Sequence, residues 1–200
     1  MVTLMGDQFL VFTGRPNAGK SSIIRAVTGL KVEVGKDPGT TQRINRYPIS
    51  EGLTLIDMPG YGRSLRGGRG KEEETKDDIL DFLELNAGSI ALAIHVVNIS
   101  TFLETEMRLA KKGFIPLDVE MVHFLKRDLG INVLVAMNKI DKGPRDYIED
   151  NVEALKEGLG PSIPVFPLSA RTDEGIGALK EEVRKRLGIR GFQSPFELIR

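Results

Sequence analysis

The chain has 200 residues, of which 40% are hydrophobic and 28% are charged, and its formal net charge at pH 7 is zero. This composition is typical of a soluble globular protein, and the zero net charge gives no support for a general attraction to nucleic acid. No cysteine is present, which excludes disulfides and thiol chemistry and favours a reducing compartment. The first residues resemble no signal peptide, and no apolar run reaches the ~20 residues of a membrane helix. We therefore expect a cytoplasmic protein without a membrane or DNA partner.

Strand-like runs alternate with helix-like runs along the chain, which predicts an α/β fold with a mostly parallel sheet. We expect six strands, over residues 9–12, 43–49, 53–57, 90–97, 133–137 and 163–168. Only the short turn 50–52 separates the second strand from the third, so this pair should form a hairpin with one strand antiparallel to the rest. Helices are expected over residues 22–27, 72–86, 102–112, 116–129, 144–158 and 175–187. These elements predict one domain over 1–200, with a core at about 9–187 and a C-terminal tail at 188–200.

The first strand leads into the glycine-rich loop Gly14-Arg-Pro-Asn-Ala-Gly19-Lys20-Ser21, and a helix-like run follows. A strand, a glycine loop and a helix in this order are typical of a phosphate-binding P-loop. The glycines let successive backbone N–H groups converge on a phosphate, and the start of a helix favours an anion. Lys20 adds a charge near the β- and γ-phosphates, and the Ser21 hydroxyl can ligate Mg²⁺. The residues that we predict to bind nucleotide here are Gly14, Arg15, Pro16, Asn17, Ala18, Gly19, Lys20, Ser21 and Ser22.

Three further short motifs stand where predicted strands end, which is the edge at which open α/β sheets bind ligands. Asp57-Met-Pro-Gly60 follows the third strand, so the Asp57 carboxylate can hold Mg²⁺ through water and the Gly60 N–H can meet the γ-phosphate. Asn138-Lys139-Ile-Asp141 follows the fifth strand, and Ser169-Ala170 follows the sixth. All of these residues are predicted to contact the nucleotide.

A guanine base accounts for the second and third of these motifs. The Asp141 carboxylate can accept hydrogen bonds from the guanine N1–H and exocyclic amine, a donor pair that adenine lacks. The stem of Lys139 can lie along the base, Asn138 can tie this loop to the P-loop, and the Ala170 N–H can meet guanine O6. Asp141 alone could equally cap a helix. The fixed order of the motifs at successive strand ends predicts a protein that binds GTP and GDP.

Longer stretches carry a family resemblance. They are the P-loop with Ser22 and the runs Pro38-Gly-Thr-Thr-Gln42, Asp57-Met-Pro-Gly-Tyr-Gly62 and Ile115-Pro-Leu-Asp-Val-Glu-Met121. Over about residues 10–187 the chain resembles the Era-like group of P-loop GTPases, and it is most similar to the EngB family of ribosome-assembly GTPases. The segment 101–121 resembles the archaeal branch of that family. One departure is Asn98, where EngB-like proteins usually carry Asp after the central strand.

The resemblance implies a Ras-like P-loop GTPase fold of three layers, with Mg²⁺-dependent hydrolysis of GTP to GDP and phosphate. It also implies a switch function in assembly of the large ribosomal subunit, with a ribosomal particle as the partner through rRNA or ribosomal protein. We expect the chain to act as a monomer. Thr40 and Thr41 lie where a γ-phosphate sensor belongs, and the resemblance favours Thr41 as the Mg²⁺ ligand. The predicted catalytic residues are then Lys20, Thr41 and Gly60.

Tyr61 stands where many GTPases carry the glutamine that orients the attacking water, so intrinsic hydrolysis should be slow. The missing charge can come from a partner or from K⁺. Asn17 is the candidate K⁺ ligand, because an asparagine at this loop position helps to hold K⁺ in some relatives. The alternative is a loop asparagine chosen for its tolerance of unusual backbone angles, and both interpretations stay open.

Several other residues receive structural interpretations. His95 lies within an apolar strand and is expected to be a core histidine with satisfied hydrogen bonds. Phe192 and Phe196 should hold the tail against the body of the protein. One basic cluster is either a solvated loop or a contact for RNA or phosphate; it comprises Arg63, Arg66, Arg69 and Lys71.

Two alternative functions stay open beside the assembly GTPase. The first is a nucleotide-gated module that binds RNA or protein with negligible turnover. The second is a stand-alone regulatory GTPase of another Era-like system, such as one for transport or tRNA modification.

Overall fold

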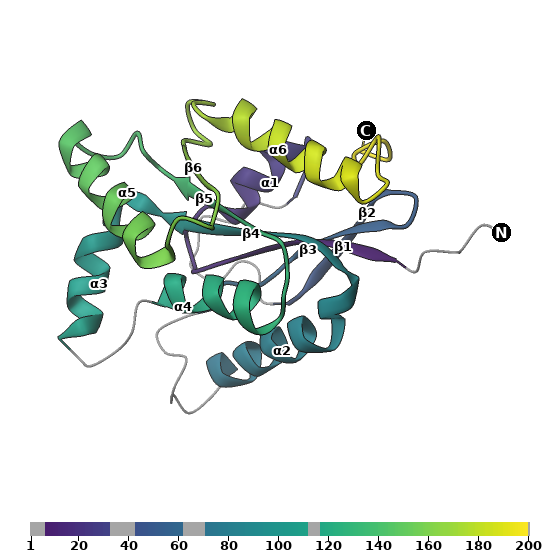
Figure 1. The fold of residues 1–200 in the computed structure, drawn as a ribbon, viewed down its shortest axis with the longest axis horizontal. Helices are drawn as coiled ribbons and strands as arrows, with labels where there is room; N and C mark the ends of the chain where they lie inside the picture. Colours follow the sequence, from purple (N-terminus) through teal and green to yellow (C-terminus); the bar gives the residue numbers. More distant parts are fainter. Residues whose placement is uncertain (1–6, 33–42, 62–70, 112–116, 200) are drawn as a thin grey trace.

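Figure 1 shows the fold as a computed structural model, which describes residues 7–32, 43–61, 71–111 and 117–199, without the side chains of residues 71–76, 109 and 110. The strands are β1 (Gln8–Gly14), β2 (Asn45–Ser50), β3 (Leu53–Asp57), β4 (Ile90–Asn98), β5 (Val133–Asn138) and β6 (Val165–Leu168). The helices are α1 (Lys20–Thr28), α2 (Lys71–Asn86), α3 (Phe102–Ala110), α4 (Leu117–His123), α5 (Arg145–Leu159) and α6 (Ile176–Ile189). Within the described residues, no helix combines the length and the apolar character needed to cross a membrane.

The six strands form one sheet in the order β2-β3-β1-β4-β5-β6. β2 pairs antiparallel with β3, and every other neighbouring pair is parallel. The predicted fold class is therefore confirmed, including the hairpin and its one antiparallel strand.

Helices cover both faces of the sheet (Figure 1). α1 and α6 pack on one face, and α2, α3, α4 and α5 pack on the other. Strand β1 is a continuous apolar run because helices cover it on both sides. Leu10 and Phe12 face the layer of α1 and α6, while Phe9 and Val11 face the other layer. A strand buried on both faces has no polar side to alternate with.

Because β1, β3, β5 and β6 run in the same direction, their carboxyl ends lie on the same side of the sheet. From β1 the chain passes through α1 to the hairpin on one side, and from β3 it passes through α2 to β4 on the other side. The direction of winding thus reverses beside β1. In open α/β sheets this reversal opens a crevice at the carboxyl ends of the strands, and the P-loop follows β1 directly into it.

The predicted helix over 116–129 is only partly correct. The α-helix ends at His123, and a wider π-helical turn continues over Phe124–Asp128. Within it the Leu129 N–H donates to the Phe124 carbonyl, five residues back, at 3.0 Å. This turn keeps Leu125 fully buried while Arg127 and Asp128 stay exposed, so packing of the apolar side chain overrides the regular α-helical pattern.

The C-terminal segment packs against the protein as predicted. Phe192 and Phe196 lie partly buried against the apolar layer that contains α1 and α6. The Leu198 N–H donates to the Ile49 carbonyl at the end of β2 at 3.1 Å, and the Ser50 hydroxyl donates to Glu197 at 3.1 Å. The last residues therefore hold the outer strand of the hairpin.

Candidate functional site

The two glycines of the P-loop occupy positions that only glycine fits. Gly14 has φ +141° and lies against the Val96 carbonyl of β4, where a Cβ would clash. Gly19 has φ +99° and lies against the side-chain amide of Asn138. Both residues adopt backbone angles that side chains disfavour, and both approach a neighbouring strand too closely for a Cβ. The loop is therefore shaped by β4 and β5 as well as by its own sequence.

Lys20 begins α1 and is buried, with 7% of its surface exposed. Its ammonium group donates to the carbonyls of Gly14 at 3.1 Å and Arg15 at 3.3 Å. Burial lowers the pKa of Lys20 to about 8, although the nearby carboxylates of Asp57 and Asp118 act in the opposite direction. The structure thus holds an amine at the P-loop whose charge is poorly compensated.

Asp57 ends β3 with only 2% of its surface exposed. Burial raises the pKa of Asp57 to about 6, and the positive charge of Lys20 only partly offsets this. Its Oδ1 atom has no hydrogen-bond partner among the described residues. A buried carboxylate oxygen without a partner, near a P-loop whose Ser21 carries a hydroxyl, fits a hard cation such as Mg²⁺.

Asn138 joins the two loops at the base end of the site. Its amide Nδ2 donates to the Ala18 carbonyl of the P-loop at 2.9 Å. Its Oδ1 accepts hydrogen bonds from the N–H groups of Lys139 at 2.9 Å and Ala170 at 3.1 Å. The prediction that Asn138 ties its loop to the P-loop is confirmed. The Ala170 N–H already donates to Asn138, so its bond to guanine O6 stays a prediction.

The Asp141 side chain is only 8% exposed and its carboxylate is held from two sides. The Ser169 hydroxyl donates to Oδ1 at 2.6 Å, and the Arg171 guanidinium donates to Oδ2 at 2.7 Å. The bond from Ser169, followed by that from Arg171, lowers the pKa of Asp141 despite its burial. Arg171 is 72% exposed, so it can leave when a ligand brings its own donors. The arrangement presents an ionised acceptor.

Comparisons with known proteins agree with this geometry. Residues 9–139 match a family model described as a 50S ribosome-binding GTPase. A probable GTP-binding protein EngB from Methanopyrus kandleri is 40% identical over 88% of this chain and 92% of that protein. The chain belongs to the EngB family of GTP-binding proteins.

Solved structures place the EngB-family chain among similar folds. The crystal structure of a probable GTP-binding protein EngB has a TM-score of 0.76 at 33% identity, covering 91% of this chain and 99% of that one. Era in complex with MgGDPNP and nucleotides 1506–1542 of 16S ribosomal RNA has a TM-score of 0.61 at 20% identity, covering 91% of this chain and 57% of that one. At that identity the second likeness shows the fold alone. The predicted family is confirmed, and with it a GTPase domain.

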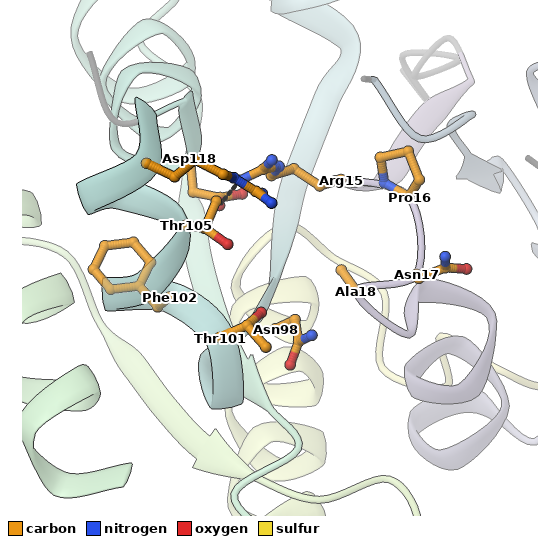
Figure 2. A pocket seen from close by; sticks show the side chains of 10 residues that line it. Arg15, Pro16, Asn17, Ala18, Asn98, Thr101, Phe102, Thr105 and Asp118 are labelled. Atoms are coloured by element: carbon orange, nitrogen blue, oxygen red, sulfur yellow. Dashed lines mark ion pairs between the residues drawn. The ribbon is translucent and has the colours of Figure 1, made fainter. Parts of the chain in front are cut away.

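A pocket of about 380 Å³ lies beside the P-loop of this EngB-family chain. Figure 2 shows the P-loop residues on one side of it and the end of β4 with the start of α3 on the other. Asn17 lines this pocket and has φ +61°, which confirms that the position needs a residue tolerant of a left-handed backbone. The polar residues that line it are Arg15, Asn17, Asn98, Thr101, Thr105, Arg108 and Asp118.

Several predicted site residues lie outside the described residues. These are Thr40 and Thr41 with the rest of 38–42, Gly62, Arg63, Arg66, Arg69 and positions 115–116, together with the side chain of Lys71. Gly60 is described and packs so closely on the backbone of Pro16 that a Cβ would lie 2.7–2.8 Å from it. Gly60, three residues after β3, therefore lies directly against the P-loop.

Two acidic residues near the P-loop were missed by the sequence reasoning. Asp118 of α4 is 3% exposed and bonds to His95, and Glu106 of α3 has two carboxylate oxygens without a partner among the described residues. Burial, with the nearby negative charge of Asp118, raises the pKa of Glu106 to about 7. The signal was an acid at position 118 within a run of otherwise buried apolar residues.

Proposed function

We propose that this chain hydrolyses GTP to GDP and phosphate with Mg²⁺, as a molecular switch in assembly of the large ribosomal subunit. The observation that carries the proposal is the bridge made by Asn138. It brings the acceptor loop of Asp141 onto the same edge as Lys20 and Asp57, so that one guanine nucleotide can reach both ends. The nucleotide preference can be tested by calorimetry with GTP, GDP and ATP. Equal affinity for GTP and ATP would contradict the role given to Asp141.

The residues of the phosphate end have distinct tasks in this proposal. The N–H groups at the start of α1 bind phosphate oxygens, and Lys20 neutralises charge between the β- and γ-phosphates. Ser21 and, through water, Asp57 would hold Mg²⁺, with Thr41 as the further ligand that the resemblance favours. When bound, Mg²⁺ neutralises charge on the β- and γ-phosphates. The Gly60 N–H would meet the γ-phosphate from the side of β3.

The ribosomal part of the proposal is supported by the matching family model, which is described as a 50S ribosome-binding GTPase. Sedimentation with large ribosomal subunits tests it, in the presence of GDP or of a non-hydrolysable GTP analogue. We expect the chain to sediment with the subunits mainly with the analogue. Lys20→Met serves as a control with strongly weakened triphosphate binding. Equal sedimentation of the unmodified chain with GDP, the unmodified chain with the analogue, and the variant with the analogue would contradict a nucleotide-controlled partner.

One observation favours the nucleotide-gated binding module as a second candidate. Tyr61 is 3% exposed and its hydroxyl lies 3.4 Å from His95 Nε2, inside the protein. This side chain therefore offers nothing to orient an attacking water, and the turnover of the isolated chain should be slow. Single-turnover hydrolysis with and without large subunits separates the candidates. Stimulation by the subunits supports the GTPase switch, and negligible hydrolysis in both samples supports the binding module.

A further inference from the structure

A buried row of polar side chains runs from the P-loop strand to α4, outside the nucleotide contacts described above. Thr13 of β1 lies opposite His95 of β4 in the sheet, and their Oγ1 and Nδ1 atoms are 2.9 Å apart. On the other side of the imidazole, His95 Nε2 lies 3.0 Å from Asp118 Oδ1. The histidine is satisfied on both nitrogens, so its expected role as a core histidine is confirmed.

The order of hydroxyl, imidazole and carboxylate resembles that of a nucleophilic triad, but burial argues against such a role. Thr13 and His95 are both 0% exposed, so no substrate can reach the hydroxyl. A carboxylate only accepts hydrogen bonds, so His95 Nε2 donates to Asp118, while Nδ1 pairs with the Thr13 hydroxyl. The row is therefore a structural connection.

Two parts of the phosphate end attach to this row. The Arg15 guanidinium of the P-loop lies 3.9 Å from Asp118 Oδ2, an ion pair drawn in Figure 2. The Tyr61 hydroxyl lies 3.4 Å from His95 Nε2, and the two rings are stacked with centroids 6.2 Å apart. Burial and the charge of Asp118 raise the pKa of Tyr61 well above its ordinary value, so the phenol stays neutral. The Asp118 carboxylate is thus connected to the P-loop directly through Arg15, and to Tyr61 indirectly through His95.

Tyr61 links this row of side chains to Gly60 and so to the expected position of the γ-phosphate. Tyr61 directly follows Gly60, whose backbone packs on Pro16 of the P-loop. A fixed Tyr61 side chain therefore fixes Gly60, and Gly60 carries the N–H expected to meet the γ-phosphate. A diphosphate does not reach that N–H. Loss of the anchor should weaken binding of the triphosphate alone, because the loop would then have to be ordered on binding.

We infer that Asp118 is a positioning residue for the γ-phosphate, acting through His95 on Tyr61 and directly on Arg15. The inference rests on the proposed function, since it assumes that GTP occupies the P-loop. It predicts that α4 is coupled to the triphosphate end of the site and is not coupled to the guanine end.

The test measures the affinities of the full chain for GDP and for a non-hydrolysable GTP analogue. Asp118→Ala should weaken analogue binding by about 10-fold and change GDP binding by less than about 2-fold, within the range of measured couplings between sites. Asp118→Asn retains an acceptor for His95 and should recover most of the analogue affinity. Asp128→Ala, in the exposed end of the same helical segment, is the matched control and should change neither affinity.

A second variant keeps the test decisive if Asp118→Ala fails to fold. Tyr61→Phe keeps the ring and removes only the hydroxyl, and it should lower analogue affinity about 3-fold with GDP affinity unchanged. In the Asp118→Ala background this change should have no further effect, because the two residues act through one connection. Equal losses for GDP and the analogue, or no loss for either, would overturn the inference. If the unmodified chain binds neither nucleotide, the proposed function fails first.

Discussion

The base end and the phosphate end of the site are built in opposite ways. At the base end, Asn138 makes three hydrogen bonds and Asp141 makes two, and the pKa of Asp141 is lowered. At the phosphate end, burial lowers the pKa of Lys20 to about 8 and raises that of Asp57 to about 6. One end is complete by itself, and the other holds charges that the protein alone compensates poorly.

This difference indicates a separate task for each end of the site. A preorganised acceptor discriminates between bases, because a wrong base leaves a desolvated carboxylate without its donors. Poorly compensated buried charges favour a ligand of high charge, since Mg²⁺ and a triphosphate would supply the missing partners of Asp57 and Lys20. We therefore expect specificity to come from the base end and most of the binding energy to come from the phosphate end.

The largest effect should follow from loss of the P-loop ammonium. Lys20→Met should lower GTP affinity by at least ~100-fold, because removing one partner of a buried charged contact costs about 2–5 kcal/mol. The free energy of unfolding should change by less than about 1 kcal/mol, since Asp57 can take up a proton when the lysine is lost. Calorimetry and urea denaturation measure the two quantities, and Lys185→Met at the exposed end of α6 is the matched control. A variant that mainly loses stability would show that the loop is structural.

The base end should respond less in affinity and more in specificity. Asp141→Asn replaces an acceptor oxygen by an amide donor that faces the donors of guanine, so GTP affinity should fall by ~30–100-fold. Xanthine carries a carbonyl in place of the exocyclic amine, so XTP should bind the variant better than GTP does. Competition binding with the two nucleotides checks this. Asp173→Asn, an exposed change in a neighbouring loop, should leave the preference for GTP intact.

The phosphate end should also respond to pH through Asp57. The pKa of Asp57 lies above its ordinary value of 3.8, so this group contributes stability at low pH that is lost as pH rises through about 6. Binding of Mg²⁺ has the opposite dependence, because it needs the ionised carboxylate. The affinity for Mg²⁺ with GTP should therefore fall about 10-fold between pH 7.5 and pH 5. Asp57→Asn should bind Mg²⁺ weakly with little pH dependence, and an unchanged profile would remove Asp57 from the metal site.

Sequence reasoning predicted the elements of this comparison because the relevant signals are local. The glycines at 14 and 19 place Lys20 at the start of a helix, and the polar residues at the ends of apolar runs place Asp57 and Asn138 at strand ends. Their charge states could not be predicted, because burial depends on layers assembled from distant segments. The same limit hid Asp118, whose partner His95 lies 23 residues away in the chain. His95 in turn meets Thr13 only through the pairing of β1 with β4.

The smallest expected effect concerns K⁺ at Asn17. The Tyr61 side chain is turned into the protein, so it cannot orient the attacking water in hydrolysis by the isolated chain. Asn17 lies on the P-loop and lines the pocket whose far side carries Asn98 and Thr101, and its amide points away from these two residues (Figure 2). We expect turnover to be several-fold faster in K⁺ than in Na⁺.

The choice of variant for that test follows from the backbone. Asn17 has φ +61°, so Asn17→Ala would combine loss of the amide with backbone strain. Asn17→Gly removes the side chain and keeps the left-handed angle, and it should erase the difference between the two salts while GDP affinity stays within about 2-fold. If Asn17→Gly retains the preference for K⁺, the cation is held by other groups. Equal rates of the unmodified chain in both salts would leave a partner as the source of the missing charge.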